Sequence, residues 1–233
     1  MAVLSLRLAG PLQAWGVDSR FVQRQTRQEP TKSGVLGLLA AAQGRRRTDP
    51  VEDLVGLKFG VRVDQPGRLI RDFQTARTLD GRSSMPLSYR YYLGDAVFLA
   101  AVEGPEPLLQ GLKGAVANPA YPLYLGRRSC VPSGRICLGV SDEDLDSALR
   151  SQPWLAATWH RKRQRSRSVR LEIIRDALSP DEEGETLRDV PSSFSPENRQ
   201  YGWRTVVRPE PHEVPNELGR LTEHDPLAEL GGS

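Results

Sequence analysis

The stretch MAVLSLRLAGP, residues 1–11, sets the first element of the fold. Apolar and polar side chains alternate along it, and three leucines at every second position share one face, which is typical of a β-strand. Gly10 and Pro11 end the run, because glycine and proline favour turns. We therefore predict a strand over residues 2–9, at the start of a sheet.

Further elements follow outward from this strand. Thr31 can cap a helix that stops near Gly44, because the intervening apolar residues have helical spacing. The later patterns predict strands over residues 57–64, 95–102 and 135–140 and a helix over residues 106–116. This order predicts an α+β protein with a ferredoxin-like, RRM-like βαββαβ core.

An insertion interrupts the core at about residues 68–92. It carries several arginines and an Asp80-Gly81 turn signal, so we expect a protruding β-hairpin. Beyond residue 140 the patterns predict a helix near residues 142–150, strands near 169–174 and 201–207, and an acidic, proline-rich loop up to residue 200. We accordingly predict a domain over residues 1–140, a small C-terminal extension with β-strands over residues 141–208, and a disordered tail over residues 209–233.

Charge is distributed unevenly along the 233 residues. The formal net charge is +3, but residues 1–135 hold 19 Lys and Arg against 11 Asp and Glu, and the remaining residues are acidic on balance. Arginine outnumbers lysine strongly, and arginine can bind phosphate and stack on bases. A high genomic GC content gives the same bias, so composition alone does not establish nucleic-acid binding. The basic run Arg161–Arg170 is either a solvated face or a track for a nucleic-acid backbone.

Several function classes are not favoured. No apolar run approaches the length of a membrane span, and no signal peptide is recognisable, so we expect a cytoplasmic protein without a membrane partner. Cys130 and Cys137 have the spacing of neither a metal knuckle nor a disulfide framework, so we expect reduced, packed thiols. We predict no metal site and no cofactor.

Three short motifs carry the binding hypothesis. In GRRS, Gly126 lets the backbone approach a ligand closely, and Arg127, Arg128 and Ser129 could hold phosphates. The alternative is a turn whose arginines lie in solvent or pair with a carboxylate. In PLQAWG, Trp15 is a core residue or a base-stacking platform. In TKSG, a helix start could hold a phosphate or be merely capped. The other candidate RNA-binding residues in and near these motifs are Gln13, Gly16, Arg24, Arg27, Lys32 and Ser33.

Catalysis has little support in the sequence. His160, His212 and His224 all lie outside the predicted core, and no phosphate-binding loop, nucleophile elbow or metal-ligand pair is present. A metal-independent endoribonuclease is therefore the alternative hypothesis, and a non-catalytic protein is the first.

Five motifs together resemble one known family. LRLAGPLQAWG, TKSGVLGLL, RDFQT, YLGDAVF and YLGRRSC, between residues 6 and 130, are similar in order and spacing to the CasD subunit family of the type I-E CRISPR Cascade complex, within the RAMP superfamily. Gln74 in RDFQT stands where related members are expected to carry histidine, and this difference is a further argument against nuclease activity.

The resemblance implies a function as well as a fold. It implies a non-catalytic subunit that binds the 5′ handle of the guide RNA and caps a filament of backbone subunits in antiviral defence. It also implies contact with the large subunit of Cascade, and with target DNA only indirectly. The hairpin would be a thumb that contacts a backbone subunit, and its candidate contact residues are Arg71, Arg77, Arg82, Tyr89 and Arg90.

Overall fold

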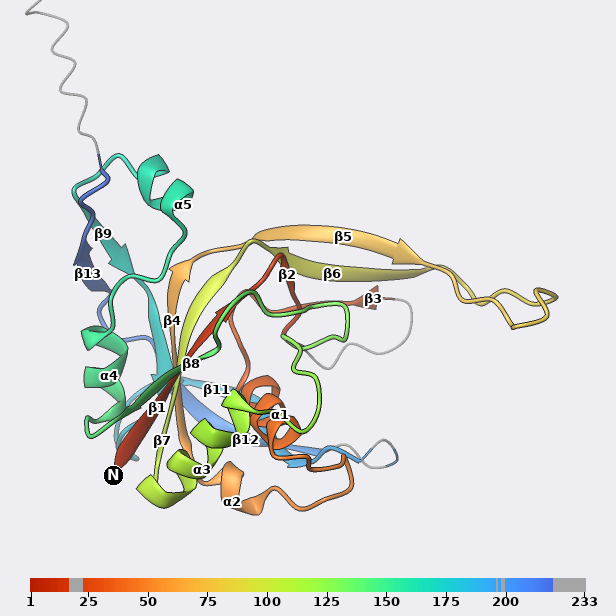
Figure 1. Ribbon diagram of the computed structural model, residues 1–233, viewed down its shortest axis with the longest axis horizontal. Helices are drawn as coiled ribbons and strands as arrows, with labels where there is room; N and C mark the ends of the chain where they lie inside the picture. The colour runs from red at the N-terminus through yellow and green to blue at the C-terminus, as the bar shows by residue number, and fades with distance from the viewer. Residues whose placement is uncertain (17–22, 196, 198–199, 220–233) are drawn as a thin grey trace, which may run out of the picture.

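The computed structural model describes residues 1–16, 23–195, 197 and 200–219 (Figure 1). Its strands are β1 (Ala2–Ala9), β2 (Leu12–Gln13), β3 (Gln23–Arg24), β4 (Lys58–Gln65), β5 (Arg68–Gln74), β6 (Ser88–Gly94), β7 (Val97–Gly104), β8 (Cys137–Ser141), β9 (Ser168–Leu171), β10 (Ile173–Asp176), β11 (Glu185–Ser193), β12 (Gln200–Val207) and β13 (His212–Pro215). Its helices are α1 (Lys32–Ala42), α2 (Glu52–Val55), α3 (Glu106–Ala117), α4 (Leu145–Ser151) and α5 (Thr158–Arg163).

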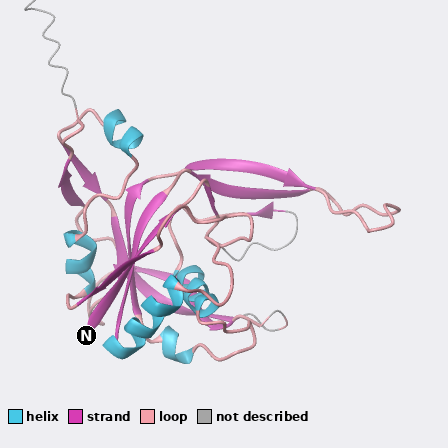
Figure 2. Ribbon diagram, viewed as in Figure 1, coloured by secondary structure: helices cyan, strands magenta, loops and turns pink. Residues whose placement is uncertain are grey.

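A seven-stranded sheet organises the molecule, with the order β11-β12-β10-β4-β7-β1-β8. Figure 2 shows that strands form the body of the molecule and that the helices lie around them. All of its neighbouring strands pair antiparallel. Helix α1 follows β1 in the chain, and α3 follows β7. The fold is therefore a mixture of helices and strands dominated by antiparallel sheet, in agreement with the predicted α+β class.

The two faces of the sheet hold two separate apolar cores. Leu4, Leu6 and Leu8 of β1 belong to the larger core, to which α1 and α3 also contribute. Val3 of the same strand belongs to the smaller core on the other face, with α4. The alternation of β1 thus has the predicted period, but both of its faces are buried.

Helix α1 begins where the sequence predicted. The Thr31 side chain accepts a hydrogen bond from the Gly34 amide at 3.2 Å, as an N-cap residue does. A Cβ atom at Gly34 would lie 2.9 Å from the ring of Trp15, so the absence of a side chain there lets the indole pack against the first turn. Trp15 is fully buried by this contact and its neighbours.

Strands β5 and β6 form a hairpin that projects from the sheet and continues into a long loop (Figure 1). An isolated bridge joins Arg77 and Ser84 beyond the paired strands, and Gly81 at the turn has a φ of 69°. Strands β2 and β3 pair with β6 near the base of the hairpin. A hairpin with a turn at Asp80-Gly81 was predicted from the sequence.

The sheet continues beyond residue 140. Strand β10 pairs with β4, and β12 pairs with β10, so the predicted extension shares a sheet with the predicted first domain. Arg62 and Asp64 of β4 form a fully buried ion pair, with Nε and Oδ1 2.7 Å apart. The Arg62 guanidinium also donates to carbonyl oxygens of Leu149, Gln152 and Pro153, which ties the segment after α4 to the sheet.

Two predictions about the C-terminal part were wrong. The acidic, proline-rich segment contains the nine-residue strand β11, whose pairing with β12 holds it in the sheet. The expected tail contains β13, which pairs with β9 and buries Val214. Its prolines are compatible with this position because β13 pairs on one side only. The rest of the predicted tail, residues 220–233, lies outside the described residues.

Candidate nucleic-acid interface

The GRRS loop is a tight turn pressed against the segment that follows β1. The Leu125 amide donates to the Cys130 carbonyl at 2.8 Å, and the Ala14 amide donates to the Leu125 carbonyl at 3.0 Å. Gly126 has a φ of 95°, and a Cβ atom there would lie 1.7 Å from the Ala14 carbonyl oxygen. The close approach predicted for this glycine therefore occurs, but it is to the chain's own backbone.

Arg127 points inward from this loop. Its guanidinium donates to the carbonyl oxygens of Tyr91 at 2.9 Å, Arg24 at 2.8 Å and Gln25 at 3.2 Å. It also lies over the ring of Tyr92, 4.8 Å from the centroid. These contacts join the loop to β6 and β3 and give Arg127 a structural role, while phosphate binding by Arg127 stays a prediction.

Arg128 and Ser129 point outward and are exposed. Arg128 has no hydrogen bond or ion pair with any residue that the structure describes. The Ser129 hydroxyl lies 3.5 Å from the Tyr92 hydroxyl. Of the two adjacent guanidiniums, one is therefore part of the framework and the other is available to a ligand.

Gln13 and Trp15 are buried, and the hypothesis that they contact RNA is corrected. The Gln13 amide donates to the carbonyl oxygens of Ala96 at 2.7 Å and Leu8 at 3.2 Å, and its oxygen accepts from the Trp15 indole at 3.1 Å. Both side chains have an exposed fraction of 0%. Of the two roles that the sequence allows for Trp15, the structure shows the core residue and not the stacking platform.

Lys32 is also unavailable to a phosphate. It is 6% exposed, and its ammonium lies 3.0 Å from Asp176 Oδ2, while its backbone amide donates to Asp189 at 2.9 Å. Arg204 completes the network through bonds to both carboxylates. The start of α1 is thus occupied by protein carboxylates. Ser33, half-buried, lies with its hydroxyl 3.4 Å from that of Thr31.

The remaining predicted residues near the GRRS loop lie at the surface. Arg24 is exposed, and its carbonyl is one of those held by Arg127. Gly16 is exposed, and Arg27 is partly buried with its Nε 3.8 Å from Glu29. Because Arg127 bonds to the backbone of Arg24, the exposed residues Arg24, Arg128 and Ser129 belong to one region, which we call the loop surface.

The predicted thumb residues lie along the hairpin. Arg71 and Tyr89 face each other across it, with the guanidinium 5.4 Å from the ring centroid. Arg77 and Arg82 are exposed near its tip, and Arg90 is half-buried. The apolar character of this element was not predicted, although aliphatic and aromatic residues stand between its arginines in the sequence. Its exposed apolar side chains are Leu69, Ile70, Phe73, Leu79, Met85 and Leu87.

The histidines and cysteines form no reactive cluster in the described part of the chain. Burial, and to a lesser degree nearby arginines, lower the pKa values of His160 and His212, whereas burial raises those of the Cys130 and Cys137 thiols. Both cysteines are free and buried, as predicted. No group of three or more potential metal-ligating residues occurs among the described residues, and His224 lies outside them. None of the described helices combines the length and hydropathy needed to cross a membrane.

Comparisons with known proteins identify the family. The model of the CRISPR-associated protein family Cas_Cas5 matches residues 3–207. The CRISPR system Cascade subunit CasD of Escherichia coli K12 is 37% identical over 158 residues, which are 58% of this chain and 70% of that protein.

Two solved structures share the fold over nearly the whole chain. One, described as a Cas protein, has a TM-score of 0.70 and 38% identity and covers 94% of this chain and 97% of its own. The other, from a CRISPR RNA-guided surveillance complex, has a TM-score of 0.72 and 34% identity and covers 93% of this chain and 92% of its own. The length of these matches, together with the shared fold, shows that the chain belongs to the CRISPR-associated Cas5 family.

Proposed function

We propose that this chain is a non-catalytic, CasD-like subunit of a cytoplasmic CRISPR surveillance complex and binds the 5′ handle of the guide RNA at the loop surface. The observation that carries the proposal is that the two adjacent arginines differ in their contacts. Arg127 fixes the loop through three backbone carbonyls, and Arg128 leaves an exposed guanidinium on that fixed support. Because the loop is fixed in advance, its backbone loses little conformational freedom when Arg128 binds phosphate.

The similarity to CasD and to a subunit of an RNA-guided complex supports this assignment. In the same proposal, strands β4, β7, β1 and β8 with α1 and α3 form a ferredoxin-like core, because their order and the helix placement match a βαββαβ unit. The β5–β6 hairpin is the thumb. The large subunit and, through the assembled complex, target DNA are its further partners.

RNA binding at the loop surface is tested with a labelled RNA that begins with the repeat-derived handle. Arg128→Ala is expected to weaken binding by about 1 to 2 kcal/mol, or about 5- to 30-fold, because one charge-assisted contact is lost. The slope of the logarithm of affinity against the logarithm of salt concentration should also become shallower by about one unit, because one fewer counterion is released. The matched control is Arg47→Ala, which removes an exposed arginine in the loop between α1 and α2. Equal effects of both changes would refute a specific site.

Catalysis is tested with the same protein and a precursor guide RNA in EDTA. The proposal predicts no specific cleavage. A cleavage product that forms with the purified wild-type chain, and that disappears in a His160→Ala or His212→Ala variant, would establish the endoribonuclease instead.

The thumb is proposed to dock on a backbone subunit through its exposed apolar side chains. Phe73 and Leu79 have exposed fractions of 67% and 111%, so replacing them does not disturb a core. Such apolar exposure on a projecting element is typical of a protein interface. Phe73→Asp with Leu79→Asp is expected to abolish co-purification with the backbone subunit but to leave RNA binding by the isolated chain unchanged. Retained co-purification would refute this docking.

A further inference from the structure

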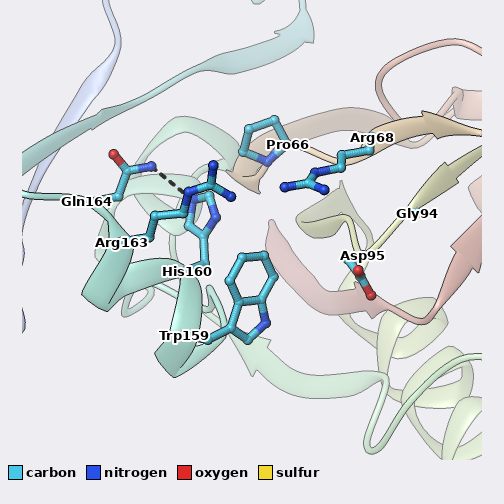
Figure 3. Close-up of a pocket in the computed structure, with 8 residues that line it drawn as sticks. All are labelled: Pro66, Arg68, Gly94, Asp95, Trp159, His160, Arg163 and Gln164. Carbon is cyan, nitrogen blue, oxygen red and sulfur yellow. Dashed lines mark hydrogen bonds between the residues drawn. The ribbon is translucent and has the colours of Figure 1, made fainter.

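A pocket of about 490 Å³ lies between the base of the hairpin and α5 (Figure 3). Arg68 and Asp95 line it from the hairpin side, and Trp159, His160, Arg163 and Gln164 line it from α5 and the residue that follows. Its volume falls within the range of about 300 to 1,000 Å³ that is usual for small-ligand sites. None of these residues belongs to the loop surface.

The lining of the pocket carries a net positive charge. Arg68 and Arg163 are both exposed, and neither makes an ion pair or hydrogen bond with a described residue. Figure 3 shows their guanidiniums pointing toward one another across the pocket. Asp95 is the one carboxylate among the lining residues, and it lies on the Arg68 side. Two like charges that face each other favour an anion between them.

An exposed indole lies beside these charges. Trp159 is 51% exposed, whereas Trp15 and Trp154 belong to the buried apolar residues. The ring of His160 packs edge-on against Trp159, with centroids 5.6 Å apart, and so supports the indole from one side. An aromatic face that remains open to solvent on a helix is suited to stack a planar group.

His160 adds a fixed polar group at the back of the pocket. Its Nε2 lies 3.3 Å from the amide nitrogen of Gln164, the contact drawn in Figure 3. Burial, with a smaller effect from Arg163, lowers the pKa of His160, so its imidazole is neutral near pH 7. The two guanidiniums are therefore the cationic groups that a ligand meets here.

We propose that this pocket holds one unpaired nucleotide of the RNA that the chain binds, with its base stacked on Trp159 and its phosphate between Arg68 and Arg163. The proposal rests on the function proposed above and extends it to a second contact, outside the loop surface. An open aromatic face next to unpaired guanidiniums is the combination that binds single-stranded nucleic acid. An acidic peptide would satisfy the two charges but would make no use of the indole.

Tryptophan fluorescence of the full chain tests the stacking contact. The probe is the handle RNA, and a DNA strand of the same sequence is the comparison. We expect RNA to quench the fluorescence of the wild-type chain and of Trp203→Phe, the control for the other strongly exposed tryptophan, but to quench Trp159→Phe much less. Equal quenching in Trp159→Phe and the wild type would overturn the proposal. Tighter binding of the DNA strand would overturn the assignment to RNA.

Affinity measurements test the charges and keep the two proposals apart. Trp159→Ala is expected to lower RNA affinity about tenfold, and Arg163→Ala about fivefold. The control is Lys162→Ala, an exposed neighbour on α5 that does not line the pocket. If Arg128→Ala weakens binding but both pocket variants bind within twofold of the wild type, the pocket proposal is wrong and the loop surface stands. If none of these changes affects binding, the proposed function itself is wrong.

Discussion

Replacing Arg127 by methionine tests whether this arginine belongs to the framework. Methionine keeps much of the length and the apolar stem but donates no hydrogen bond. The bond to the Tyr91 carbonyl is partly buried, so its loss is expected to cost about 1.5 to 3 kcal/mol. The bonds to Arg24 and Gln25 are exposed, and water replaces them at little cost. The cation–π contact with Tyr92 adds about 0.5 to 1 kcal/mol. The total is a destabilisation of about 2 to 4 kcal/mol.

Urea denaturation of the full chain measures this difference, and Arg128→Met is the matched control. The control is expected to change the free energy of unfolding by less than about 0.5 kcal/mol, because an exposed side chain without a described partner is replaced. RNA affinity is measured in parallel. If Arg127→Met costs less than about 1 kcal/mol and lowers RNA affinity more than the control does, Arg127 leaves its carbonyls to bind RNA and the assignment is refuted.

Three further predictions concern stability. Gly126→Ala is expected to lower the free energy of unfolding by at least about 2 kcal/mol, because the new Cβ would lie 1.7 Å from the Ala14 carbonyl oxygen. The control Gly81→Ala, at a position with a positive φ but open space, should lower it by only about 1 kcal/mol, and equal losses in urea denaturation would contradict the steric argument. Arg204→Met removes one partner from two buried carboxylates and is expected to lower the free energy of unfolding by about 3 to 5 kcal/mol, whereas the control Arg208→Met, at a half-exposed position, lowers it by less than about 1 kcal/mol. A loss for Arg204→Met as small as that of the control would contradict this prediction. The Arg175 guanidinium and the Leu178 amide lower the pKa of Glu182 from 4.5 to about 2, so the ionised carboxylate stabilises the fold fully above pH 4.5 and loses this effect as the pH falls toward 2. The difference in unfolding free energy between wild type and Glu182→Gln should therefore shrink over that pH range, and a constant difference would refute the linkage.

The regular elements could be predicted well because their signals are local. The alternation in β1, the cap at Thr31 and the turn at Gly81 each depend on neighbours in the sequence, and each occurs where it was predicted. Strand β11 was missed because its acidic and proline-containing sequence lacks strand propensity. Its pairing with β12 supplies the stabilisation, and that pairing is not visible in a local pattern.

The candidate site could be predicted only in part, because side-chain direction depends on distant partners. Lys32 looks like a phosphate ligand in its own motif, but its carboxylate partners are 144 and 157 residues away in the chain. Arg127 and Arg128 are indistinguishable in the sequence, and only the position of β6 and β3 decides which one turns inward. The pocket beside α5 joins residues 68 and 163, so no single motif could indicate it.

The pairing of β10 with β4 limits how this protein can be divided. A shortened chain that ends at residue 140 would strip β4 of one neighbour and leave a bare sheet edge, which invites aggregation. It would also remove Asp176, which binds the ammonium of Lys32, and Asp189, which accepts from the backbone amide of Lys32. Because the two parts of the sequence share one sheet, we expect them to unfold as one cooperative unit.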